Sequence, residues 1–117
     1  MSNREVLRNA LDSYAEKIKP ARVEIPEIGQ AVYIRKLTLG EVEEQAADSA
    51  SKDKTRLAYA VARVLVDDSG KALYNKDDEA DIKKLSLQPW PLISRILDES
   101  NKVNSLSEEG VKAAEKN

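Results

Sequence analysis

The stretch KTRLAYAVARVLVDDSGKALY, from Lys54 to Tyr74, is the longest apolar run of the chain and predicts the centre of its core. Alanines between the larger side chains would let neighbouring elements approach from several sides. Asp67-Asp68-Ser69-Gly70 predicts the end of the helix, because Gly70 can adopt the positive φ of a turn at little steric cost. We therefore expect a buried helix with large apolar residues at helical spacing, namely Leu57, Val61, Val64 and Leu65.

The composition favours one helical domain. A chain of 117 residues can bury enough surface for a single core. Apolar residues make up 41% of the chain but aromatics only 4%, with no phenylalanine, so the core has to be built from Leu, Ile, Val and Ala. The 19 basic and 21 acidic residues nearly cancel, which argues against a surface that binds nucleic acid through net charge.

Missing residue types and segments indicate the compartment. The absence of cysteine excludes disulfides, thiolate zinc sites and thiol nucleophiles, and it suits the reducing cytoplasm. No apolar run approaches the roughly 20 residues that span a bilayer. The beginning MSNREVLRNA also lacks the hydrophobic block of a signal peptide. We expect a soluble protein that is not exported and does not bind membranes.

Residues 1–20 predict an amphipathic helix that ends before Pro20. Ser2 and Glu5 resemble a capping box at its start. One helical stripe then carries the large apolar side chains. Most such stripes face the protein's own core, so intramolecular packing is the first expectation and contact with another molecule is the alternative. The stripe consists of Leu7, Leu11, Tyr14 and Ile18.

Residues 21–37 predict a β-hairpin. The segment from Pro26 to Gln30 contains Gly29 and has the turn chemistry of a longer hairpin loop. A two-stranded ribbon is marginal alone, so it has to lie on helices. Alternation places one apolar face on the two strands, consisting of Val23, Ile25, Val32 and Ile34.

Residues 38–50 predict the next helix. Thr38 and Glu41 can cap its start reciprocally, through the hydroxyl and the carboxylate. We expect its apolar side to pack on the central helix and its acidic side to face water. The apolar side is Leu39, Val42, Ala46 and Ala50, and the acidic side is Glu41, Glu44 and Asp48. A polar break, residues 49–53, would separate it from the central helix.

The remaining elements follow Gly70. Leu73 and Tyr74 should return to the core, and a short helix from Asn75 to Leu85 should turn Ile82 and Leu85 inward. Pro89 suits the first position of a last helix, and Trp90 would lock the start of that helix onto the body of the protein. The apolar stripe of that helix is Leu92, Ile93, Ile96, Leu97 and Val103.

These elements predict a mostly α-helical α+β fold in which a short two-stranded hairpin packs on a bundle of four to five helices. Residues 1–104 would form a single globular domain, with the N-terminal helix over 1–20, the hairpin over 21–37 and the helical body over 38–104. Residues 105–117 contain few large apolar side chains and are expected to be a mobile or weakly helical tail.

Catalytic and metal-binding patterns are missing, so we expect no enzyme, no metal and no cofactor. There is no histidine or cysteine, and the carboxylates form no specific motif. The loop that ends at Gly70 fails the calcium pattern, because Leu65 would occupy the first ligand position. A later group of acidic residues could be a magnesium site, but we favour the start of a helix, where negative charge complements the helix dipole. Those acids are Asp77, Asp78, Glu79 and Asp81.

Three further residues are candidate partner contacts. Arg56 and Arg63 stand seven apart and could bind a phosphate or an acidic partner, although a solvated stripe that pairs with nearby acids is favoured. Trp90 lies between two prolines and could be an interface hot spot, although anchoring in the core is favoured.

The order of the signals over residues 23–117 resembles the tail assembly chaperones of long-tailed, siphovirus-like bacteriophages. The resemblance rests on VYIRKLT at 32–38, a Glu-rich helix at 41–44, VLVDDSGKALY at 64–74, and Asp77-Asp78 leading to Ile82 and Leu85. The last helix with residues 101–106 and the ending AEKN at 114–117 also look like that family.

The resemblance implies a binding protein of the host bacterial cytoplasm that is absent from the mature virion. It would bind the tape measure protein, keep it soluble and help to recruit tail tube subunits. It would form a homo-oligomer and could associate with a longer form of itself made by ribosomal frameshifting. We take the stripe of the N-terminal helix as the first candidate surface, because an apolar helix face can pack against an exposed apolar helix.

Two alternatives belong to other classes. The protein could be a structural tail or connector subunit of the virion, in which case purified particles would contain it. It could also be a small regulatory protein that binds nucleic acid through Arg56 and Arg63, in which case duplex binding would depend on salt.

Overall fold

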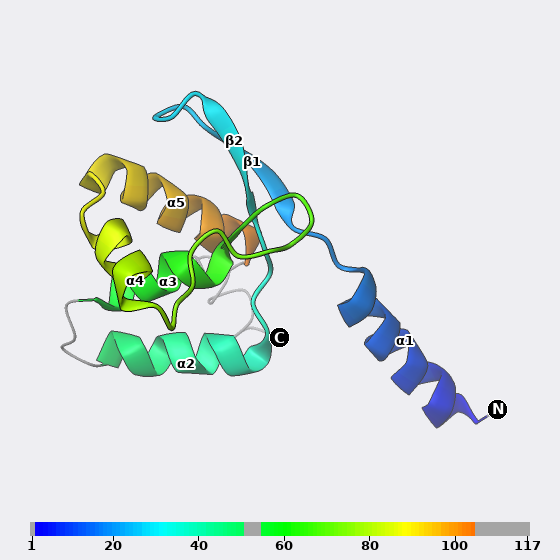
Figure 1. Ribbon diagram of the computed structural model, residues 1–117. Helices are drawn as coiled ribbons and strands as arrows, with labels where there is room; N and C mark the ends of the chain where they lie inside the picture. The colour runs from blue at the N-terminus through cyan, green and yellow to red at the C-terminus, as the bar shows by residue number, and fades with distance from the viewer. Residues whose placement is uncertain (1, 51–54, 105–117) are drawn as a thin grey trace.

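The computed structural model describes residues 2–50 and 55–104 (Figure 1). Within these residues, helices surround one side of a small antiparallel sheet. The elements are α1 (Asn3–Lys17), β1 (Ala21–Ile25), β2 (Gln30–Ile34), α2 (Leu39–Ala50), α3 (Arg56–Val64), β3 (Leu65–Val66), α4 (Glu79–Ser86) and α5 (Trp90–Val103). The predicted tail, residues 105–117, and most of the predicted polar break lie outside the described residues.

Helix α3 is the centre of the body, as the apolar run predicts. Val61 and Val64 are fully buried, and the nearby alanines Ala58, Ala60 and Ala62 are buried as well. These small residues allow close approach, and α2, α4 and α5 all pack against α3. Leu57, at the beginning of the helix, is only partly buried. The prediction of an interior helix is therefore confirmed for its second half.

The sheet has three strands in the order β1-β2-β3, so the prediction of a two-stranded hairpin is wrong by one strand. Helix α3 ends at Val64, two residues earlier than expected, and Leu65 and Val66 pair with Ile34 and Tyr33 of β2. A short apolar run is compatible with both a helix end and a buried strand. Here it forms a strand, because β2 has unpaired backbone groups on its free edge with which Leu65 and Val66 can form hydrogen bonds. Pairing with β3 covers that edge of the hairpin.

The hairpin itself follows the predicted alternation. Val23 of β1 faces Val32 of β2, and the turn between the strands contains Gly29 at φ 66°. Ile25 and Ile34 are completely buried on the inward face. Helix α5 covers this face and contacts both β1 and β2.

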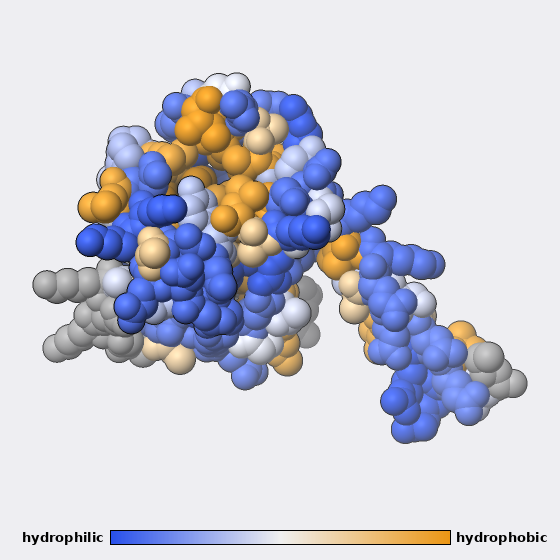
Figure 2. Space-filling view, viewed as in Figure 1, coloured by the Kyte–Doolittle hydropathy of each residue, from blue (hydrophilic) through white to orange (hydrophobic). Residues whose placement is uncertain are grey.

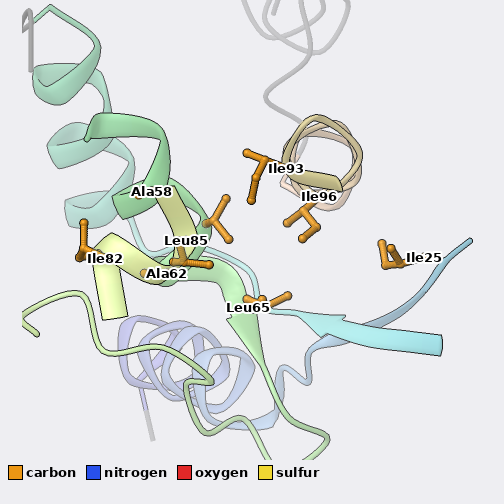
Figure 3. Close-up of a cluster of buried hydrophobic side chains, with 9 residues drawn as sticks. Ile25, Ala58, Ala62, Leu65, Ile82, Leu85, Ile93 and Ile96 are labelled. Atoms are coloured by element: carbon orange, nitrogen blue, oxygen red, sulfur yellow. The ribbon is translucent and has the colours of Figure 1, made fainter. Parts of the chain in front are cut away.

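The core lies where α3, α4, α5 and the inward face of the hairpin meet (Figure 3). Ile93 and Ile96 of α5 enter it from one side, and Ile82 and Leu85 of α4 from another, as their spacing predicts. Helix α4 begins at Glu79, later than the predicted start at Asn75, because Asp78 caps it by accepting a hydrogen bond from the N–H of Ala80 at 2.9 Å. Tyr74 packs on the cluster, whereas Leu73 is about half exposed, which corrects the prediction that both return to the core.

Helix α2 differs from the prediction on both of its sides, although Val42 is partly buried as expected. Leu39 is 75% exposed, and Ala46 is exposed too, whereas Glu44 and Asp48 contact the buried Arg63 of α3. Leaving the buried guanidinium without carboxylate partners would cost more free energy than leaving the small apolar side of α2 exposed to water, because an unpaired buried charge is very costly. The start of α2 is as predicted: the N–H of Glu41 donates to the Thr38 hydroxyl, and the Glu41 carboxylate accepts from the N–H of Thr38.

Helix α1 extends away from the body and ends in the extended residues that lead into β1 (Figure 1). None of its residues is buried. The expectation that its stripe packs on the protein's own core is therefore wrong. At the opposite end of the described chain, Asn104 ties α5 to the segment after β2, because its Oδ1 accepts from the N–H of Leu37 at 2.7 Å.

Candidate partner-binding surface

Local sequence is sufficient to begin and end α1. The Ser2 hydroxyl accepts a hydrogen bond from the N–H of Glu5 at 3.2 Å, which satisfies one of the free donors of the first turn. Lys17 lies in the last turn, where a cation complements the helix dipole. Pro20 follows, and the extended Ile18 closes the helix. The helix is thus well defined although it lies outside the core.

The apolar stripe of α1 is open to solvent along most of its length. The exposed fractions are 56% for Leu7, 70% for Leu11 and 63% for Tyr14, and the neighbouring Val6 is 48% exposed. Ile18, at the junction with the body, is partly buried. Figure 2 shows apolar atoms on α1 where it leaves the body. An exposed apolar face on an otherwise polar helix is typical of an interaction surface.

Charged residues of α1 occupy the other sides of the helix. Glu5, Asp12 and Glu16 recur at steps of seven and four and therefore lie together, away from the stripe. Arg4 and Arg8 lie between that acidic side and the stripe, by the same spacing. The stripe is consequently bordered by charge, as in helices that bind an apolar groove.

Arg63 is part of a charge cluster and does not form a solvated stripe. Its side chain is 2% exposed, which contradicts the prediction of a solvent-facing residue, although the predicted pairing with nearby acids is confirmed. Nη2 donates to Asp48 at 2.5 Å and to Glu44 at 3.1 Å. Burial alone would lower the pKa of Arg63, but the hydrogen bonds that it donates to these carboxylates and their negative charge outweigh burial and raise the pKa above its ordinary value.

A second ion pair holds the beginning of α2. Arg35 donates to both carboxylate oxygens of Glu41, with Nη1 at 2.8 Å from Oε1. The Arg35 guanidinium, aided by hydrogen bonds from Thr38, lowers the pKa of Glu41 from 4.5 to about 2. Together with the Arg63 cluster, this pair attaches α2 to the body mainly through charge.

Arg56 and Trp90 lie on separate parts of the surface. Arg56 is exposed at the beginning of α3, as expected for a solvated residue. Trp90 is 60% exposed at the first residue of α5, so the prediction that it anchors in the core is wrong. The physical reason is that Ile93 and Ile96 already fill the position facing the core, one turn further along the helix. Trp90 instead lines a cavity of about 280 Å³ beside Leu57.

The candidate contacts therefore do not form one surface. The four stripe residues lie together on α1, whereas Arg56, Arg63 and Trp90 are distributed over the body. Three exposed apolar residues were not predicted among the described residues, namely Val6 beside the stripe, Ile28 in the hairpin turn and Leu87 after α4. Val6 could have been found from its position one turn before Ala10 on the edge of the stripe.

The acidic clusters have structural roles in the loops. The Asp67 carboxylate accepts from the N–H and hydroxyl of Ser69 and from the N–H of Lys71, and these bonds lower its pKa. Gly70 has φ 90°, the positive value that the turn requires. Over residues 2–50 and 55–104, no group of three or more acidic, histidine or cysteine side chains has a geometry that could hold a metal ion.

Two further findings concern the chain as a whole. Among the described helices, none combines the length and the apolarity needed to cross a membrane. Comparisons with models of protein families, with curated proteins and with solved structures found no match to this chain.

Proposed function

We propose that this protein is a non-catalytic assembly chaperone that binds an apolar helical segment of another polypeptide through the stripe of α1. The observation that supports this proposal is the exposure of Leu7, Leu11 and Tyr14 on a helix that buries none of its residues. Single exposed apolar side chains are common, but three in one row on a helix form a contiguous patch, which is typical of an interaction site. A partner that covers them would supply the contacts that the body does not.

The physics of the contact is that of a helix in a groove. Complete burial of one leucine side chain contributes roughly 1.5–3 kcal/mol, so a stripe of several such residues can support specific binding. Helix α1 has 15 residues, a length at which an isolated helix is marginal in water. Binding would therefore stabilise the helix as well as cover its face.

The resemblance to tail assembly chaperones identifies the partner in this proposal as the phage tape measure protein. A tape measure segment exposes apolar helical surface until tail tube subunits enclose it, and α1 would cover that surface in the interval. Recruitment of tail tube protein, assembly into a homo-oligomer and association with a longer frameshifted form belong to the same proposal. The protein would act in the host cytoplasm and be absent from the finished particle.

The test is co-purification of the tape measure protein with the full chain and with Leu11→Glu. Because Leu11 is exposed, the variant should fold normally, and its circular dichroism and melting temperature should match those of the parent. A charge in the centre of the stripe should reduce tape measure capture at least about tenfold, since it removes more than about 1.4 kcal/mol of apolar burial. Undiminished capture would reject this surface.

The matched control is Leu87→Glu. Leu87 is 75% exposed, close to the value for Leu11, and lies after α4 on the body. This variant should capture tape measure protein as the parent does. Mass spectrometry of purified particles separates the proposal from a structural tail subunit, because a chaperone should be missing from them.

A further inference from the structure

The guanidinium of Arg63 has donors that the α2 carboxylates do not reach. Glu44 and Asp48 both bind Nη2, whereas the buried Nε and Nη1 have no hydrogen-bond partner. An arginine has five N–H donors, and these two nitrogens carry three of them. Buried donors without an acceptor are rare in folded proteins and need an explanation, of which a bound polar group is one.

Arg63 lines a cavity of about 440 Å³ between α3 and the loop after β3, which we call the Arg63 pocket. Its lining is rich in hydrogen-bond donors and includes two more cations. The lining residues are Arg35, Ala62, Arg63, Ala72, Tyr74, Asn75, Lys76 and Asp77. Asp77 is the acidic member of this set, and the cavity has a volume that suits a small ligand.

The carboxylates that balance these cations lie on α2 and do not line the cavity. Glu41 holds Arg35, and Glu44 and Asp48 hold Arg63. Lys76 is the most loosely held of the three cations, because its Nζ is 3.7 Å from Glu44 and its side chain is 40% exposed. The α2 acids therefore fix the guanidinium groups from one side, and Lys76 is free to turn toward a ligand.

We propose that the Arg63 pocket binds an oxyanion, the carboxylate or phosphate group of a small ligand. Arg63 lines the pocket and its Nε and Nη1 are buried, so the ligand would have to displace a neighbouring side chain to reach them. Lys76 would supply a second charged donor and Asn75 a neutral one. This inference does not depend on the role of α1, since none of the pocket residues belongs to that helix.

The test follows the Nε–H resonance of Arg63 in the ¹⁵N-labelled full chain, assigned from its loss in Arg63→Lys. Sodium glutarate and sodium phosphate are titrated separately at constant ionic strength, with sodium chloride as the third arm. A saturable shift with glutarate, with phosphate or with both supports the proposal and identifies the source of the oxyanion. An absence of saturation with both anions, or an equal shift with chloride, would overturn it.

Two charge-matched variants sharpen the result. Lys76→Gln should weaken the binding of the oxyanion about tenfold, the loss expected for one charge-assisted hydrogen bond. Lys102→Gln removes the same charge at an exposed position of α5 outside the pocket and should leave the affinity unchanged. Equal weakening by both variants would show general screening and reject a specific site.

Discussion

Helices α1 and α5 carry similar apolar stripes but lie in opposite environments. Ile93 and Ile96 of α5 are 7% and 4% exposed, whereas Leu11 of α1 is 70% exposed. Helix α5 is positioned against α3 and the inward face of the hairpin, which together offer a continuous apolar surface. Helix α1 is connected to the body by extended residues and points away from it. An amphipathic pattern thus predicts that a face will be covered, but not by which molecule.

Helix α2 is a third case, held mainly by charge. Its exposed Leu39 contrasts with Asp48 and Glu44, which turn inward to Arg63. Apolar packing is insensitive to pH and only weakly affected by salt, whereas ion pairs respond to both. The three helices should therefore differ in how much they contribute to stability and in which conditions weaken them.

The largest effect is expected in α5. Ile96→Ala removes a fully enclosed side chain and should lower the free energy of unfolding by about 2–5 kcal/mol, from lost burial and the cavity left behind. Leu11→Ala in α1 should change it by less than about 0.5 kcal/mol, because that side chain is exposed. Urea titration of both variants measures the contrast. Similar losses in the two would mean that α1 packs on the body in solution.

The charge cluster under α2 should give the next largest effect. Asp48→Asn weakens the shortest hydrogen bond of the buried Arg63 and should cost about 2–3 kcal/mol, because that cation loses a counter-charge. Glu43→Gln, on the exposed side of the same helix, should cost almost nothing. Thermal unfolding of the two variants tests this. If they behave alike, charge pairing does not hold α2.

The Arg35–Glu41 pair should make α2 sensitive to acid. The pKa of Glu41 is lowered from 4.5 to about 2 in the folded protein, so the unfolded chain binds more protons at intermediate pH. This contribution is fully present above pH 4.5 and is lost as the pH falls toward 2. After allowance for partial exposure, we expect roughly 1–2 kcal/mol.

The measurement compares the unfolding free energy of the parent and of Glu41→Gln at several pH values. The variant should be less stable at pH 6 and should approach the parent near pH 2.5. Glu79→Gln provides the control, because its carboxylate is exposed in the first turn of α4. A constant difference between parent and Glu41→Gln across this range would exclude the pair as the acid-sensitive element.

The smallest effect should come from removal of α1. A chain that begins at Pro20 should unfold within about 1 kcal/mol of the full chain, since α1 buries no residue. Tape measure capture, in contrast, should be lost. A large fall in stability would mean that the contacts at Ile18 matter more than its partial burial indicates.

Much of the fold could be predicted because local signals were strong. The caps at Ser2 and Thr38, the alternation of the hairpin and the turn at Gly70 all depend on neighbouring residues, and the structure has each of them. The third strand could not be predicted, because Leu65 and Val66 suit a helix end as well as a strand. Their pairing depends on Ile34 and Tyr33 of β2, which are more than thirty residues away in the sequence.

The candidate surface was predicted less completely. The stripe residues of α1 were identified from periodicity, but the same periodicity favoured the protein's own core as their partner. The predictions for Trp90 and Arg63 were both wrong, since Trp90 is exposed and Arg63 is buried. The burial of a residue depends on which other elements pack against it. The sequence contained the acids that pair with Arg63, but it gave no indication that α2 turns them inward.

From the sequence alone follow the helices, the hairpin, their caps and the existence of two amphipathic faces, because hydrogen bonds and periodicity act over a few residues. Tertiary structure decided which face is buried, which is exposed and which is held by charge. The body has a limited apolar surface on which a helix can pack, and α5 packs on it while α1 does not. The stripe of α1 is therefore exposed, and the proposed function depends on this exposure.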